Sequence, residues 1–273
     1  MKKYFINLKR SPERTKYISQ EAKRVGLKDF HFFNAIDAKS KNISEISVLY
    51  NPKSWKAYWE LTPTEVAVFE SHRLLWEKCA KTNNIPFLIC EDDIIMSSKL
   101  PFVLDEISKD TFKFDVIHLD CSDAVYRLGK PKKLDVAISL APVLQPLASA
   151  AAYVISPSGA RKLLYMSRNG FCDHVDDFIT RPRKNFCILQ ILPAICVQGM
   201  FSKSSNVPFE IKISERTLNS NEIDFIHKGP IVYRLLKELR RFARSTSRKL
   251  LLDKSLINKG GSVGKIILEK DIK

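Results

Sequence analysis

Apolar and polar residues alternate in blocks along this chain of 273 residues. Short apolar runs are typical of buried strands, whereas longer stretches with apolar residues three or four apart are typical of helices. The blocks predict strands at residues 4–8, 30–33, 86–90, 115–119, 150–155 and 191–197, and helices at 12–26, 63–81 and 157–165. Strands that alternate with helices favour a mostly parallel sheet covered by helices on both faces, so the expected fold class is α/β.

Two of the predicted helices begin with recognisable capping residues. Ser11 precedes Pro12, and proline suits the first position of a helix because it has no backbone N–H to leave unpaired. Thr62, Pro63 and Glu65 have the pattern of a capping box, in which the threonine and glutamate side chains each accept a backbone N–H. These signals predict helix starts at residues 12 and 63.

The composition is that of a globular protein. Hydrophobic residues make up 45% of the chain, and no stretch approaches the roughly 18 apolar residues that a membrane-spanning helix needs. The six cysteines are scattered without a CxxC pair, which is typical of small core residues in a reducing compartment. The first residues turn polar by Asn7 and show no signal-peptide pattern, so the expected location is cytoplasmic.

Positive charge is concentrated at the C-terminal end. The formal net charge is +15, and residues 228–273 contribute +9 of it, from 13 basic residues against 4 acidic ones. The difference, +6, belongs to residues 1–227. We therefore expect a main domain over 1–227 and a basic helical segment with a tail over 228–273, which would attract surfaces that carry phosphate.

Residues 229–252 have the pattern of a basic amphipathic helix. Apolar residues recur three and four apart along one side, and arginine and lysine occupy the other faces. The pattern is typical of a helix that lies on an anionic membrane surface, where each basic residue contributes about 1 kcal/mol. A helix that packs its apolar side on the main domain would show the same pattern. The sequence leaves both interpretations open.

Three consecutive carboxylates, Glu91, Asp92 and Asp93, directly follow the apolar run 86–90. Ligands of open α/β sheets gather at the carboxyl ends of the strands, and three adjacent negative charges repel one another unless a cation joins them. Mg²⁺ and Mn²⁺ prefer such oxygen ligands and often share them with substrate phosphates. The triplet therefore indicates a metal and phosphate site, with a solvated acidic turn that caps the next helix as the alternative.

Two further groups of polar residues are candidates for the same site. Glu65 and His72 lie two helical turns apart on one face of a predicted helix, although a capping glutamate and a buried histidine need no other role. Asp176 belongs to a second acidic cluster with Asp173 and Asp177. One of these carboxylates can serve as a general base for a hydroxyl group, or the cluster is the acidic first turn of a helix.

Residues 259–265 look like a phosphate-binding loop but lack its defining residues. Lys259 stands where the first glycine of the motif belongs, and Ile266 stands where a serine or threonine would bind the metal. We therefore expect a flexible tail at this end of the chain.

In combination, many of these residues and their neighbours form an ordered series of short motifs. The motifs lie at residues 5–11, 13–14, 35–37, 61–65, 71–72, 75–76, 88–93, 152–156, 159–160, 175–176, 198 and 202. The series resembles glycosyltransferase family 25, the lipooligosaccharide galactosyl- and glucosyltransferases. It spans roughly residues 3–205, which makes the resemblance far more specific than any single motif.

The resemblance implies a GT-A-type fold, inversion at the anomeric carbon, a divalent metal (Mn²⁺ or Mg²⁺) and a UDP-sugar donor. It implies transfer of a hexose to a sugar of a lipooligosaccharide or lipopolysaccharide acceptor at the inner membrane face. Galactose from UDP-galactose, in β-linkage, is the first expectation, and the resemblance leaves glucose open as the alternative sugar. The implied metal ligands are Glu91 and Asp93, and the implied base is Asp176. The residues expected to contact the donor are Asn7, Arg10, Arg14, Asp37, Glu65, His72 and Asp92.

Two other classes of function fit parts of the sequence. A metal-dependent phosphoryl-transfer enzyme such as a nuclease also uses clustered carboxylates. A non-enzymatic module that binds a membrane or nucleic acid would account for the basic C-terminal end, but it gives the acidic triplet no role. We therefore expect a peripheral membrane enzyme that binds a nucleotide sugar, a lipooligosaccharide and an anionic membrane surface, and no nucleic acid.

Overall fold

The computed structural model describes residues 1–39, 45, 61–109, 113–170, 172–202, 208, 211, 235–236, 238–239 and 252–272. Most of the basic helix predicted at 229–252 lies outside the described residues. The domain boundary predicted after residue 227 lies outside them too and stays a prediction.

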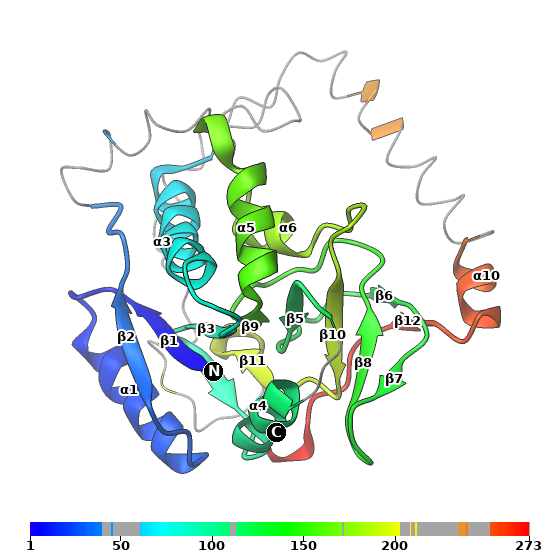
Figure 1. Ribbon diagram of the computed structural model, residues 1–273, viewed down its shortest axis with the longest axis horizontal. Helices are drawn as coiled ribbons and strands as arrows, with labels where there is room; N and C mark the ends of the chain where they lie inside the picture. Colours follow the sequence, from blue (N-terminus) through cyan, green and yellow to red (C-terminus); the bar gives the residue numbers. More distant parts are fainter. Residues whose placement is uncertain are drawn as a thin grey trace.

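A large mixed sheet organises the described part of the chain (Figure 1). Its eight strands are, in spatial order, β2 (Phe30–Asn34), β1 (Lys2–Asn7), β3 (Phe87–Glu91), β9 (Ala152–Ile155), β5 (Val116–His118), β10 (Ile188–Leu192), β8 (Ser139–Pro142) and β7 (Lys132–Lys133). Two small sheets pair β4 (Ile94–Met96) with β11 (Cys196–Gln198), and β6 (Tyr126–Leu128) with β12 (Ser262–Gly264). The helices are α1 (Pro12–Arg24), α3 (Pro63–Ala80), α4 (Leu100–Lys109), α5 (Pro157–Met166), α6 (Val175–Thr180) and α10 (Asp253–Asn258). Short 3-10 turns are η1 (Arg168–Gly170), η2 (Gly199–Phe201) and η5 (Lys270–Ile272).

Most strands of the large sheet run in one direction, as the sequence predicted. β1 is parallel to both β2 and β3, and β5 is parallel to β10. β9 lies between β3 and β5 and is antiparallel to both, and β8 is antiparallel to β10. Because β9 is reversed, its first residues lie at the edge of the sheet where β3 and β5 end.

Alternating residues of the central strands supply two hydrophobic layers. In β3, Phe87 and Ile89 belong to the layer that also contains residues of α3, α5 and α6. Leu88 and Cys90 belong to the layer that contains residues of α1 and α4. Figure 1 shows α3, α5 and α6 on one side of the sheet and α1 and α4 on the other. The predicted helical cover on both faces is therefore confirmed.

Both predicted helix starts, at residues 12 and 63, are confirmed, but only one of the two predicted side-chain caps forms. At α3, the Glu65 N–H donates to the Thr62 hydroxyl at 3.3 Å, and the Thr62 N–H donates to the Glu65 carboxylate at 2.9 Å. Ser11 occupies the position before α1, but its side chain makes no capping hydrogen bond. The single strand predicted at 191–197 is wrong: it divides into β10 and β11 around Pro193, which has no N–H to give to a ladder.

The C-terminal residues 252–272 pack on the rest of the described chain. β12 pairs with β6, and Arg127 binds both carboxylate oxygens of Asp253, at 2.6 and 2.8 Å. The flexible tail expected at 259–265 is therefore wrong. Lys259 and Gly260 form a turn instead, in which Gly260 adopts a left-handed conformation (φ 80°) that leads the chain into β12.

All six cysteines are free thiols, and five of them are buried. Those in the layer with α3, α5 and α6 are Cys79, Cys121 and Cys172, and those in the layer with α1 and α4 are Cys90 and Cys196. Burial raises the pKa of each of these five thiols. They are small core residues, as predicted, and Cys187 alone of the six is exposed.

Candidate functional site

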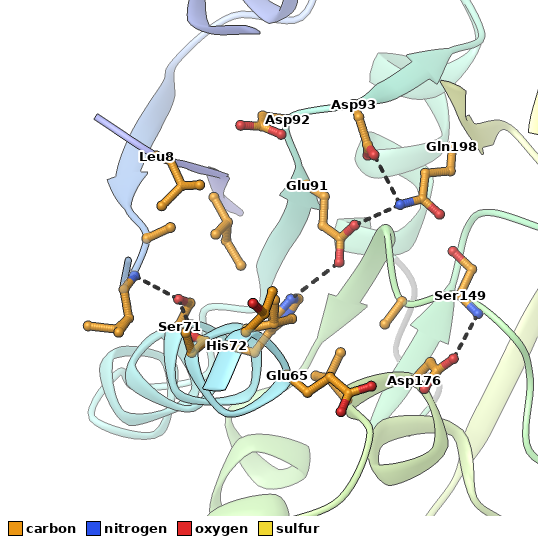
Figure 2. A pocket seen from close by; sticks show the side chains of 18 of the residues that line it. Leu8, Glu65, Ser71, His72, Glu91, Asp92, Asp93, Ser149, Asp176 and Gln198 are labelled. Carbon is orange, nitrogen blue, oxygen red and sulfur yellow. Dashed lines mark hydrogen bonds and ion pairs between the residues drawn. The ribbon is translucent and has the colours of Figure 1, made fainter. Parts of the chain in front are cut away.

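A pocket opens at the edge of the sheet where β1 and β3 end and β9 begins (Figure 2). Its volume is about 400 Å³. The lining includes eight of the ten residues predicted for the site, namely Arg10, Arg14, Glu65, His72, Glu91, Asp92, Asp93 and Asp176. The fold thus brings the predicted residues of α1, α3, β3 and α6 to one cavity.

The other two predicted residues, Asn7 and Asp37, support the pocket without lining it. Asn7 lies behind the acidic triplet and donates from Nδ2 to Asp92 at 2.7 Å. Asp37 accepts a hydrogen bond from Arg10 at 2.8 Å, while the residues on either side of it line the pocket. Their expected contacts with a donor stay predictions.

Asp92 is neutralised by the protein itself. Arg14 Nη1 lies 2.7 Å from one carboxylate oxygen, and Asn7 donates to the other. In Figure 2 the Asp92 side chain points away from Glu91 and Asp93. Asp92 therefore ties the end of β3 to α1, and it is the member of the triplet least suited to hold an added cation.

Glu91 and Asp93 share a single amide as their common hydrogen-bond donor. Gln198 Nε2 donates to one oxygen of each carboxylate, at 3.1 Å in both cases. The second oxygen of Asp93 is buried and has no hydrogen-bond partner among the described residues. Burial, and then the neighbouring carboxylates, raise the pKa of Glu91 to about 8 and the pKa of Asp93 well above its usual range. A cation placed between these two groups would stabilise their charged forms.

The arrangement fits a divalent cation that is shared with a phosphate-bearing substrate. Among the residues that the structure describes, no group of three or more His, Cys, Asp or Glu side chains is arranged to hold a metal ion alone. Glu91 and Asp93 offer two carboxylates, including the unpartnered Asp93 oxygen. Mg²⁺ is commonly held by one or two carboxylates together with substrate phosphates. Glu91 and Asp93 would therefore supply part of a ligand set, which a diphosphate could complete.

Asp176 is the one carboxylate of the second acidic cluster that lines the pocket. Its neighbours Asp173 and Asp177 both bind Arg181, at 3.0 and 2.9 Å. Asp176 instead accepts the backbone N–H groups of Ser149, at 3.3 Å, and Asp177, at 2.8 Å. The local sequence pattern did not distinguish the three aspartates. In the structure Asp176 differs from the other two because it lines the pocket and they bind Arg181.

Glu65 and His72 line the pocket but are also held by protein partners. Glu65 accepts the Thr62 N–H in the capping box, and its other oxygen lies 3.2 Å from His174 Nδ1. His72 is fully buried, and its Nδ1 lies 2.9 Å from the Tyr153 hydroxyl. Burial lowers the pKa of His72 to about 3, so the imidazole is neutral at physiological pH. Donor contacts of both residues stay predictions.

A further carboxylate at this edge, Asp120, follows β5 and is completely buried. It accepts the Ser149 hydroxyl and the Ala152 N–H, and it lies 3.0 Å from His118 Nε2. Ser149 has a positive φ of 95°, which is uncommon for a residue with a side chain. Asp120 thereby holds the loop that gives its N–H to Asp176.

Gln198 and Ser149 are among the residues of the site that carried no role in the sequence analysis. Gln198 reaches Glu91 and Asp93 because β11 pairs with β4, which places Gln198 opposite Ile94. Ser149 belongs to the loop before β9 and carries no chemical signal in its sequence context. Gln198 belonged to the family resemblance, and that membership was the one signal that could have identified it.

Fold and site together define an α/β enzyme with an acidic pocket at the carboxyl edge of its sheet. Residues 1–179 match a known family, and the chain belongs to it: glycosyltransferase family 25 (LPS biosynthesis protein). The matched range contains all ten predicted site residues. Of the two enzyme classes that the sequence left open, the family supports glycosyl transfer.

Known relatives are similar over most of the chain. A putative glycosyltransferase of Haemophilus influenzae is 28% identical over 221 residues, which cover 78% of this chain and 75% of the relative. The lipooligosaccharide biosynthesis protein lic2B of Haemophilus influenzae is 25% identical, with 93% of this chain and 97% of the relative covered. A glycosyltransferase 25 family member of Aedes aegypti is 29% identical over 174 residues, which cover 59% of this chain and 27% of that longer protein.

Proposed function

We propose that this protein is an inverting, GT-A-type glycosyltransferase that moves galactose from UDP-galactose, in β-linkage, to a sugar of a lipooligosaccharide or lipopolysaccharide. One observation carries the proposal: a single pocket holds the uncompensated pair Glu91 and Asp93 together with Asp176. Family membership supports glycosyl transfer, and the name of the lic2B relative supports the acceptor class.

The reaction divides between two groups of residues. Glu91 and Asp93 would hold the divalent cation. When bound, this cation would neutralise the negative charge of the leaving diphosphate. The Asp176 carboxylate accepts the proton of the acceptor hydroxyl while that oxygen forms its bond to the anomeric carbon. The bond from this carbon to the diphosphate oxygen breaks, the electron pair leaves with the diphosphate, and attack from the opposite face inverts the configuration. The N–H groups of Ser149 and Asp177 orient Asp176 for this step.

A donor screen tests the proposal. UDP-galactose, UDP-glucose and other UDP-sugars are added with and without Mn²⁺ while thermal unfolding is followed. The true donor raises the melting temperature in proportion to its binding free energy, and it does so only with Mn²⁺. The selected donor is then incubated with a lipooligosaccharide acceptor, which gains one hexose by mass spectrometry. No hexose transfer, with cleavage of a polynucleotide instead, would contradict the proposal.

We further propose that the enzyme works on an anionic membrane surface, at the cytoplasmic face of the inner membrane. Leu235, Leu236 and Leu239 are helical, and their exposed fractions are 60%, 47% and 63%. Exposed leucines among basic residues suit acyl chains and phosphate headgroups, and a lipid-linked acceptor lies in the same plane. Among the described helices, none is long and apolar enough to cross a membrane.

Substitution tests this membrane contact better than truncation does. Deleting residues 229–273 would also remove β12 and Ile272, which is buried with Ile95 and Val197. Replacing Leu235 and Leu239 by glutamine leaves that packing intact. We expect the variant to lose sedimentation with anionic vesicles and to keep its activity on a short soluble acceptor. Unchanged vesicle binding, or a full-length protein that never binds vesicles, would contradict the proposal.

A further inference from the structure

Three buried side chains connect the hydrophobic core to the acidic pocket. Trp76 Nε1 donates to the Tyr153 hydroxyl at 2.9 Å, and the same hydroxyl lies 2.9 Å from His72 Nδ1. All three side chains are fully buried, and the His72 and Tyr153 rings stack with their centroids 5.8 Å apart. The other imidazole nitrogen, Nε2, lies 3.7 Å from Glu91 Oε1. In Figure 2 a dashed line joins His72 to Glu91.

The direction of these hydrogen bonds follows from what each group can donate. An indole N–H is only a donor, so the Tyr153 oxygen accepts it. The tyrosine has one hydroxyl proton, and among the described residues the remaining partner of that hydroxyl is His72 Nδ1. A buried hydroxyl proton is costly to leave unpaired, so Tyr153 donates it to Nδ1. The neutral ring then carries its own proton on Nε2.

The opposite tautomer is disfavoured on the Tyr153 side of the ring and, once Glu91 is ionised, on the Glu91 side as well. With a proton on Nδ1, Tyr153 would accept twice, and its own proton would have no partner among the described residues. When Glu91 is ionised, the form that a bound cation would stabilise, the Nε2 lone pair would also face the oxygen lone pairs of this carboxylate. A histidine that binds a metal through Nε2 nevertheless takes this Nδ1–H form, and it donates the Nδ1 proton to a neighbouring group. The tautomer therefore decides whether His72 supports Glu91 or acts as a ligand beside it.

We propose that His72 is a positioning residue, fixed by Trp76 and Tyr153 as the Nε2–H tautomer, that directs this N–H at Glu91. Nε2 is buried and has no hydrogen-bond partner among the described residues, so Glu91 is the acceptor within its reach. Hydrogen bonds in active sites are often long before substrate binds and shorten in the complex. The role of Glu91 rests on the proposed function, whereas the tautomer of His72 does not.

Nuclear magnetic resonance of the protein without substrate tests the tautomer. The chain has five histidines, so ¹⁵N-histidine labelling gives few signals, and those lost in His72→Gln belong to His72. We expect a protonated Nε2 and an unprotonated Nδ1 at neutral pH. Tyr153→Phe keeps the ring but removes the proton given to Nδ1, so it should shift the His72 signals toward a mixture of tautomers. A protonated Nδ1 in the wild-type protein would overturn the proposal.

Two substitutions of His72 then test the positioning role, because their side-chain amides place an N–H at different positions. Glutamine can place an N–H near the position of Nε2, whereas asparagine reaches only the position of Nδ1. We expect His72→Asn to lower kcat by about a hundredfold, with the KM of the donor little changed, and His72→Gln to restore part of the loss. Melting temperatures show whether both variants are folded. Equal losses in the two folded variants, or losses confined to donor KM, would overturn the role.

If no glycosyl transfer is found at all, the proposed function fails, and the tautomer is still decided by the resonance experiment. The two failures are therefore distinguishable. A protonated Nε2 together with rescue by glutamine supports the inference as stated.

Discussion

The strands β3 and β5 run in the same direction on either side of β9, and each is followed by buried carboxylates. After β5, Asp120 accepts hydrogen bonds from Ser149 and Ala152 and lies beside His118. After β3, Asp93 keeps one buried oxygen without a partner among the described residues and shares an amide donor with Glu91.

From this difference we infer that the carboxylate after β5 stabilises the fold, whereas the carboxylates after β3 serve the reaction. A buried carboxylate that keeps an unpartnered oxygen costs free energy, because its charged form has lost water and gained few hydrogen bonds in return. A carboxylate that accepts several hydrogen bonds stabilises the loop that supplies them. We therefore expect substitutions after β3 to change activity and substitutions after β5 to change stability.

Asp93→Asn should have the largest effect on activity. Removing one negative charge weakens the binding of both cation and diphosphate, so we expect turnover to fall by more than about a thousandfold. The melting temperature should stay the same or rise, because burial disfavours the charged form of Asp93 and an amide carries no charge. Activity at different Mn²⁺ concentrations and a melting curve check both parts. Near-normal activity with an unaltered metal requirement would show that Asp93 is not a ligand.

Asp120→Ala should have the largest effect on stability. It leaves the buried partners of the carboxylate unsatisfied, and each such group costs about 1–3 kcal/mol, so we expect a loss of about 3 kcal/mol or more. Urea unfolding measures the loss. If the variant is as stable as the wild type but inactive, Asp120 belongs to the chemistry and the contrast between the two strand ends disappears.

Asp176→Asn tests a carboxylate that lines the pocket with Glu91 and Asp93 and is held by the Ser149 loop. If Asp176 is the base, the substitution should lower kcat by about a hundredfold, because the proton of the acceptor hydroxyl then has no acceptor. The KM of the donor should change little. Steady-state kinetics with varied donor and acceptor separate the two constants. A loss confined to donor or Mn²⁺ binding would assign Asp176 to the metal instead.

The smallest expected effects come from a matched pair of amides, one in each region. Gln198→Ala removes the donor shared by Glu91 and Asp93, so we expect about tenfold weaker Mn²⁺ binding and little change in stability. Gln190→Ala removes a buried amide that contacts His118 and the Asp120 carbonyl, so it should lower stability and leave Mn²⁺ affinity unchanged. Mn²⁺ titration and urea unfolding of both variants provide the comparison. The opposite pattern would contradict it.

Local patterns predicted the parts of the site that depend on neighbouring residues. The acidic triplet was located at a strand end, and the capping box fixed the start of the helix that carries Glu65 and His72. The apolar run at β9 gave no direction, because alternation and hydrophobicity are the same when a strand is reversed. Its antiparallel course was therefore not predictable from that run.

The missed residues depend on contacts between distant parts of the chain. Gln198 meets Glu91, 107 positions away, only through the pairing of β4 with β11. Asp120 and Glu91 have the same local signal, a carboxylate after an apolar run. What distinguishes them is whether a loop such as that of Ser149 folds back to satisfy the carboxylate, and local patterns do not specify that contact.

The reactivity of the cysteines can show how readily each hydrophobic layer unfolds locally. In the native protein a thiol-reactive dye would label the exposed Cys187, whereas the five buried thiols react only when their surroundings unfold. Cys79, Cys121 and Cys172 report on one side of the sheet, and Cys90 and Cys196 report on the other. Mass spectrometry of the labelled peptides over time would rank the two sides by the free energy of their opening. Cys121, which directly follows Asp120, would record a loosening of that strand end before the whole chain unfolds.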